Sequence, residues 1–137
     1  MGKTINVNYL GKDNSSKHTS LNEATFKVNN INQLPIDLLM SSYASSLMET
    51  VDYEARKHGF DSTVKKCEIS YEMSDDDSKI SSCSIFLFFE EDFDIKKTNI
   101  LEVASKINCK VGQSLSADIK KSFRFFYKTM SKACFDR

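Results

Sequence analysis

The residues of this chain best suited to covalent chemistry are its four cysteines. They lie at Cys67, Cys83, Cys109 and Cys134, and no two of them form the Cys-x-x-Cys pair that is typical of structural zinc sites. We therefore predict no metal site and no cofactor. The N-terminus carries no apolar secretory segment, so we expect a reducing, cytoplasmic setting in which these thiols are free.

Histidine chemistry and charge-driven binding are both disfavoured. The two histidines, His18 and His58, have no plausible metal or triad partner beside them, so we interpret both as solvated surface residues. Nineteen basic and nineteen acidic side chains balance, which leaves no net field to attract nucleic acid or an anionic membrane. No run approaches the roughly 18 apolar residues of a membrane span. We expect a soluble protein whose partners include neither nucleic acid nor a membrane.

A polar row on a predicted helix is the second candidate site. After Pro35, which suits a first helical turn, apolar side chains recur at helical spacing from Ile36 to Ala55. The pattern predicts a helix of about 24 residues that ends near Gly59. On it, one polar flank is formed by Ser42, Ser46, Glu49 and Tyr53. This flank could line a ligand-binding cleft, or its serines could allow close packing while the glutamate is solvated.

Strand patterns stand on both sides of this helix. Alternation over residues 4–9 and 24–28 predicts two or three antiparallel strands before it. After it, residues 67–73 and 80–89 predict a long hairpin. The unbroken apolar run in the second arm indicates a strand covered on both faces, by the helix and by a subunit or domain partner.

The rest of the chain predicts two short helices and a last strand. Apolar periodicity indicates a helix over 100–107 and allows another over 115–119, and residues 123–127 read as a strand. The segment from residue 130 has no clear pattern. We predict one domain over residues 1–129 and a C-terminal tail over 130–137. Cys67 and Cys83 fall at strand positions expected to face its core.

Two segments resemble those of a known family. The run LPIDLLMSSYASS, from Leu34 to Ser46, is similar to a proline-led helix of small residues that ends in a catalytic cysteine; Ser46 stands at that position. The run ASKINCKVGQSL is similar to the segment around a second catalytic cysteine, which Cys109 matches, with Lys110 in place of the usual proline. Together with the element order, these segments resemble the OsmC family, which includes the organic hydroperoxide resistance proteins, over about residues 3–129.

The resemblance implies an α+β fold in which antiparallel sheets wrap around a long central helix, in an intertwined homodimer with the cleft at its interface. It also implies a chemistry that this chain lacks the residues to perform. In the family the first thiolate attacks a peroxide, the resulting sulfenic acid is resolved by the second cysteine, and a dithiol such as a lipoyl group reduces the pair. The Ser46 hydroxyl is almost entirely neutral near pH 7 and cannot form a sulfenic acid.

Other parts of the family apparatus are displaced. Ile36 stands directly after the proline, where a glutamate is often found, and Asp37 follows one residue later. The N-terminal strands offer no convincing match to the family's arginine. Peroxide reduction by the usual route should therefore fail.

These observations leave three hypotheses for function. The first is an OsmC-like protein that binds a small apolar or thiol-containing ligand at the dimer interface, with Asp37, Ser42, Glu49 and Tyr53 as candidate ligand-binding residues beside Ser46. The second is a one-cysteine redox enzyme, acting on a hydroperoxide in the oxidative stress response, in which Cys109 is oxidised and an external dithiol reduces it. In this second hypothesis the Cys109 thiol is activated near the start of the following helix. The alternative is that Cys109 is an inert, partly buried thiol. The third is that the serine at position 46 was introduced artificially in place of the first catalytic cysteine.

Overall fold

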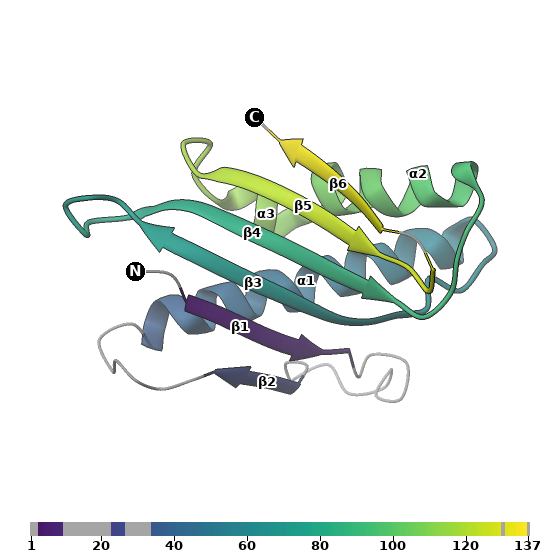
Figure 1. Cartoon of the computed structure of the whole chain (residues 1–137), viewed down its shortest axis with the longest axis horizontal. Helices are drawn as coiled ribbons and strands as arrows, with labels where there is room; N and C mark the ends of the chain where they lie inside the picture. The colour runs from purple at the N-terminus through teal and green to yellow at the C-terminus, as the bar shows by residue number, and fades with distance from the viewer. Residues whose placement is uncertain (1–2, 10–22, 27–33, 130, 137) are drawn as a thin grey trace.

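The chain folds into one mixed sheet with its helices on one face. The computed structural model describes residues 3–9, 23–26, 34–129 and 131–136. The strands are β1 (Lys3–Asn8), β2 (Glu23–Phe26), β3 (Val64–Met73), β4 (Ile80–Phe89), β5 (Lys120–Phe126) and β6 (Ser131–Asp136). They form a sheet in the order β2-β1-β3-β4-β5-β6, and the helices lie together behind it in Figure 1. The fold is therefore α+β, as predicted.

The helical layer consists of α1 and a shorter, broken segment beside it. Its elements are α1 (Leu34–Lys57), α2 (Ile95–Val103), the π-helix η2 (Ala104–Asn108) and α3 (Lys110–Ser114). The prediction for α1 is confirmed at both ends. Its C-terminus is closed by Gly59, whose φ of 84° lets the Phe60 amide donate to the Ala55 carbonyl at 3.0 Å.

The apolar stripe of α1 builds the core against the sheet. Met40, Ala44, Leu47, Met48 and Val51 have no exposed surface. They pack against the inward side chains of the central strands, which include Ile5, Val7, Ile69, Ile85 and Leu87. Each large side chain buried in this way stabilises the fold by roughly 1.5–3 kcal/mol. The same packing holds α1 across the sheet and fixes which of its flanks faces outward.

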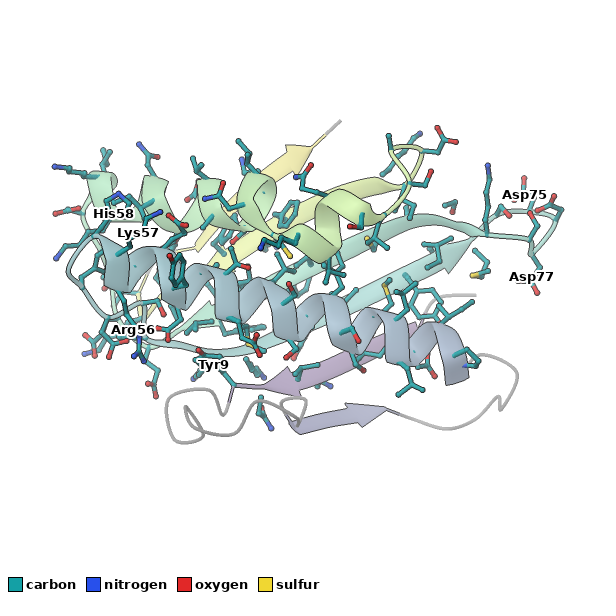
Figure 2. The ribbon with its side chains drawn as sticks, turned by 180° about the vertical axis from the view of Figure 1, so that it is seen from behind. Tyr9, Arg56, Lys57, His58, Asp75 and Asp77 are labelled. Atoms are coloured by element: carbon teal, nitrogen blue, oxygen red, sulfur yellow. The ribbon has the colours of Figure 1, made fainter. Side chains whose placement is uncertain are left out.

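The β3–β4 hairpin is confirmed, with Ile69 opposite Ile85. Its turn projects beyond the helical layer, where Figure 2 labels Asp75 and Asp77. Within the turn Asp76 accepts hydrogen bonds from the hydroxyls of Ser74 and Ser78, both at 2.7 Å, and these bonds lower the pKa of Asp76 to about 2.

We expected more than one sheet, each antiparallel, and this expectation is wrong for the single chain. The described strands form one sheet, and its β4–β5 pair is parallel. β4 and β5 are parallel because of the segment that connects them. From the end of β4 the chain passes through α2, η2 and α3 and returns to the end of the sheet at which β4 began, so β5 runs in the same direction as β4. Within the described residues α1 is covered by the sheet on one side and is flanked by α2, η2 and α3.

Cover of the outer face of β4 by a partner stays a prediction. On that face Phe86 and Phe88 are half-buried, and the Phe126 ring lies against both.

Three smaller expectations need correction. The helix expected over 100–107 begins earlier, since Asp94 caps it by accepting from the Lys97 amide at 2.8 Å. The residues 115–119 are not helical, and the segment after residue 130 contains β6, which pairs with β5.

Candidate functional site

Ser46 and Cys109, 63 residues apart in the sequence, come together in the helical layer. Ser46 lies in the middle of α1, and Cys109 lies between η2 and α3. Their side chains are hydrogen-bonded, with 3.3 Å between Oγ of Ser46 and Sγ of Cys109. Ser46 is half-buried, whereas Cys109 is only 1% exposed. The sulfur therefore lies beneath the hydroxyl, and the hydroxyl is the more accessible of the two groups.

The backbone around Cys109 is irregular in a way that orients its side chain. The helix that begins as α2 widens into the π-helical turn η2, then the chain extends at Cys109 (φ −73°, ψ 115°) before α3 begins. Single π-helical turns inside helices are frequent at functional sites. This interruption separates the two helical segments and lets Cys109 face α1.

Close packing of α3 against α1 fixes this position. Gly112 lies so near Tyr43 that a Cβ there would be 2.8 Å from Cε1 of the ring. On the other side, Lys121 from β5 donates to the Gly112 carbonyl at 2.8 Å, and its ammonium stands 5.7 Å from the Tyr43 ring centre. Because Gly112 is three residues after Cys109, this contact holds the cysteine segment at a fixed position along α1.

A groove opens beside the Ser46–Cys109 pair, with a volume of about 360 Å³. One wall is a face of α1, to which Ser46, Glu49, Thr50, Tyr53 and Glu54 contribute. The other wall is the segment around the cysteine, represented by Asn108 and Lys110. All these side chains carry a polar group, so the groove offers hydrogen-bond donors, acceptors and both signs of charge.

The structure brings some of the predicted ligand-binding residues to this groove and leaves others out. Glu49 and Tyr53 line it, and Tyr53 is 63% exposed. Ser42, one turn before Ser46, is half-buried and is not among the lining residues. Asp37 lies in the core near the start of α1, where its carboxylate accepts the Tyr71 hydroxyl at 2.9 Å. Asp37 therefore stabilises the contact of α1 with β3 rather than facing the groove.

The sequence analysis missed the remaining lining residues, Thr50, Glu54, Asn108 and Lys110. Thr50 and Glu54 continue the i, i+4 row that begins at Ser46, so the helical wheel held a signal for them. Asn108 and Lys110 flank Cys109 directly, yet nothing in the local pattern showed that they would face α1.

The two other described thiols belong to the core, as expected. Cys67 and Cys83 lie in β3 and β4 and are 0% and 2% exposed. Burial raises the pKa of Cys67 well above its ordinary value, with nearby anionic groups adding to the effect. Burial likewise raises the pKa of Cys83 to about 11, although Lys121 opposes the shift. Both thiols therefore remain protonated and unreactive near neutral pH. The side chain of Cys134 lies outside those that the structure describes.

Other kinds of site receive no support from the described ranges. Those ranges hold no group of three His, Cys, Asp or Glu side chains that could bind a metal ion. His58 is exposed at the end of α1, seen in Figure 2, with Nδ1 at 2.9 Å from the Glu54 carbonyl. His18 falls outside the described residues. None of the described helices has the length and apolar character that a bilayer crossing demands.

Comparison with known proteins identifies the architecture. A solved structure from Psychrobacter arcticus 273-4, provisionally described as an osmotic stress induced and detoxification response protein, matches with a TM-score of 0.63. The match covers 79% of this chain and 83% of that chain, at 23% sequence identity. The fold is OsmC-like. No family model matches the sequence, and no curated protein matches it significantly.

Proposed function

We propose that this chain is an OsmC-like stress-response protein that binds a small ligand, thiol-containing or apolar, in the groove beside Ser46 and Cys109, without acting as a two-cysteine peroxidase. The observation that carries the proposal is the 3.3 Å contact between the Ser46 hydroxyl and the Cys109 sulfur. The pair has the geometry of two cooperating side chains, yet one of them is an oxygen and cannot cycle through sulfenic acid and disulfide. What this arrangement retains is a groove lined by the Ser46 hydroxyl, with the buried Cys109 thiol in contact with that hydroxyl.

The second part of the proposal is a homodimer that buries the helical layer. Six large apolar or aromatic side chains are exposed among the described residues, and all lie on helices: Leu38, Leu39 and Tyr53 of α1, Ile95 and Val103 of α2, and Ile107 of η2. Such a concentration on one layer supports a covering partner. A second copy placed there would cover the outer side of α1, deepen the groove and complete the wrapping of the helix.

Dimer formation can be tested by sedimentation velocity on Leu39→Glu, which places a charge on the exposed face of α1. The proposal expects a dimer for the parent chain and a monomer for this variant. The matched control is Thr4→Glu, an exposed position on β1 whose side chain points away from the core, and it should leave the dimer intact. A parent chain that sediments as a monomer at high concentration would reject this part.

The decisive functional experiment is a peroxide-consumption assay with dihydrolipoamide as the reductant, run on the parent chain and on Ser46→Cys. The parent chain should show no turnover above background, because the attacking sulfur is missing. Turnover at the rate of a thiol peroxidase would refute the proposal. If Ser46→Cys gains activity, the site geometry is sufficient for the chemistry; if it stays inactive, the displaced acid and the missing arginine also matter.

A second candidate function is a one-cysteine redox enzyme that acts through Cys109. It is supported by the contact between Sγ of Cys109 and the Ser46 hydroxyl, because that hydroxyl lines the groove and is the one group between the groove and the buried sulfur that the contact identifies. A hydroperoxide would oxidise the thiol to a sulfenic acid and leave as an alcohol, and a dithiol would reduce it with release of water. A sulfenic-acid probe that fails to label Cys109 after peroxide treatment would end this hypothesis.

A further inference from the structure

Every side chain that lines the groove beside Ser46 carries a polar group, and the charged groups are separated between its two walls. Carboxylates stand on α1, at Glu49 and Glu54, while the ammonium of Lys110 stands on the cysteine segment. The Tyr53 ring and the alkyl parts of the other side chains give the groove apolar surface as well, so the charges are what would distinguish one small ligand from another. Both signs of charge within one groove suit a molecule that itself carries both.

Lys110 is the better defined of the two charged positions. It is exposed, and within the described ranges its ammonium makes no ion pair or hydrogen bond. It follows Cys109 directly, so any anion that it binds is held close to the Ser46–Cys109 pair. An ammonium is a compact point charge with three donors, which suits a carboxylate.

Glu54 offers the opposite charge on the facing wall. Its carboxylate is 3.5 Å from the Lys57 ammonium, an i, i+3 pair in which the lysine side chain is 56% exposed and the glutamate side chain 14% exposed. Because the lysine is solvated and an i, i+3 pair contributes little, a ligand ammonium can replace Lys57 at small cost. Glu49 lies five residues earlier, accepts from the Ser45 hydroxyl at 3.4 Å and adds negative charge to the same wall.

We infer that the ligand of this groove is a small zwitterionic thiol, with its carboxylate at Lys110, its ammonium at Glu54 and its sulfur beside the Ser46 hydroxyl. The inference rests on the proposed function and narrows its ligand from apolar or thiol-containing molecules to this class. The volume of about 360 Å³ equals the space of about twelve water molecules, which accommodates an amino acid or a short peptide.

The test is a binding titration of the 137-residue chain, followed by NMR under anaerobic conditions, with five probes of similar size. They are cysteine, cysteamine, 3-mercaptopropionate, 2-mercaptoethanol and serine, which vary the two charges and the sulfur separately. Cysteine should bind about tenfold more tightly than either singly charged thiol, and its advantage should shrink as salt is added, because the charges are exposed.

Two variants assign the charges. Lys110→Met should weaken the binding of cysteine and 3-mercaptopropionate about tenfold and leave that of cysteamine unchanged. Glu54→Gln should weaken the binding of cysteine and cysteamine about tenfold and leave that of 3-mercaptopropionate unchanged. The matched control is Lys96→Met, which removes an exposed lysine of α2 that does not line the groove. It should change none of the affinities.

The outcomes separate this inference from the proposed function. If all four thiols bind with equal affinity and Lys110→Met has no effect, the ligand need not be zwitterionic. The groove would then still bind thiols, as the proposed function states. Equal affinity for serine and cysteine would overturn the requirement for sulfur. If no thiol binds at all, the thiol-binding form of the proposed function fails together with the inference.

Discussion

Oγ of Ser46 lies 3.3 Å from Sγ of Cys109, where the middle of α1 meets the junction between η2 and α3. A disulfide needs its sulfurs about 2.05 Å apart, so a small rotation about the side-chain bonds would suffice if both atoms were sulfur. The two side chains are therefore placed as a cross-linked pair would be, but the oxygen of Ser46 cannot form a disulfide with Cys109.

The first prediction is that Ser46→Cys forms an intramolecular disulfide with Cys109 on mild oxidation. Mass spectrometry should show the loss of two hydrogens, and peptide mapping should join the two segments. The matched control is Ser42→Cys, which is displaced by one helical turn, about 5.4 Å along the axis, and should stay reduced under the same conditions. Equal cross-linking in both variants would show that the contact is not specific.

The second prediction concerns the contact that holds α3 against α1. Alanine is normally favoured over glycine within a helix by about 1 kcal/mol. At Gly112, however, the added Cβ would meet Tyr43 at 2.8 Å, and the ring is buried. We expect Gly112→Ala to lower the free energy of unfolding by about 1–3 kcal/mol in urea denaturation. In a Tyr43→Leu background the same change should cost much less, and equal costs in both backgrounds would contradict the contact.

The third prediction concerns Asp52, a buried carboxylate on α1 that ties three segments together. It accepts from the hydroxyl of Tyr9 at 2.9 Å and of Ser62 at 3.0 Å, and Nε of Arg56 lies 2.9 Å away. Figure 2 shows Tyr9 and Arg56 near the C-terminal half of α1. Burial and the neighbouring Asp52 carboxylate raise the pKa of Tyr9 well above its ordinary range. We expect Asp52→Asn to lower the free energy of unfolding by about 2 kcal/mol.

The comparison for Asp52 is Arg56→Met, since the arginine side chain is 56% exposed. Removing this exposed partner should cost less than about 1 kcal/mol. If both variants destabilise the protein equally, the ion pair rather than the two hydroxyl contacts is the stabilising interaction.

The fourth prediction concerns alkaline pH. The pKa of Cys83 rises from 9.0 to about 11 on folding, because burial favours the neutral thiol. Its contribution to stability is complete below pH 9, where both states hold the proton, and is lost as pH rises toward 11. By pH 10 the free energy of unfolding should fall by about 1 kcal/mol from this group. Urea denaturation of Cys83→Ala between pH 8 and about 10 should show a shallower decline than the parent chain.

Much of the fold could be predicted from the sequence because its signals are local. Pro35, the apolar stripe and Gly59 define α1 by helical spacing and termination alone. The hairpin of β3 and β4 follows from alternation on either side of a polar turn. The burial of Cys67 and Cys83 follows from their register in those strands.

The sequence did not predict those features that depend on contacts between particular residues or segments of the folded chain. Asp37 shares a helix with Ser46, but the hydroxyl of Tyr71 from β3 turns it into a core residue. The early start of α2 depended on one cap, Asp94, and the parallel β4–β5 pair depended on the path of the crossover. The groove wall at Lys110 exists only because η2 and the Gly112–Tyr43 contact bring that segment onto α1.

The amino-acid sequence by itself determined that an oxygen stands at position 46 and a sulfur at position 109, and therefore which chemistry is closed to the pair. Only the tertiary structure decided that the two atoms touch and that side chains of opposite charge line a groove beside Ser46. Covalent identity is a property of single residues, whereas proximity and burial arise when segments far apart in the chain pack into one core.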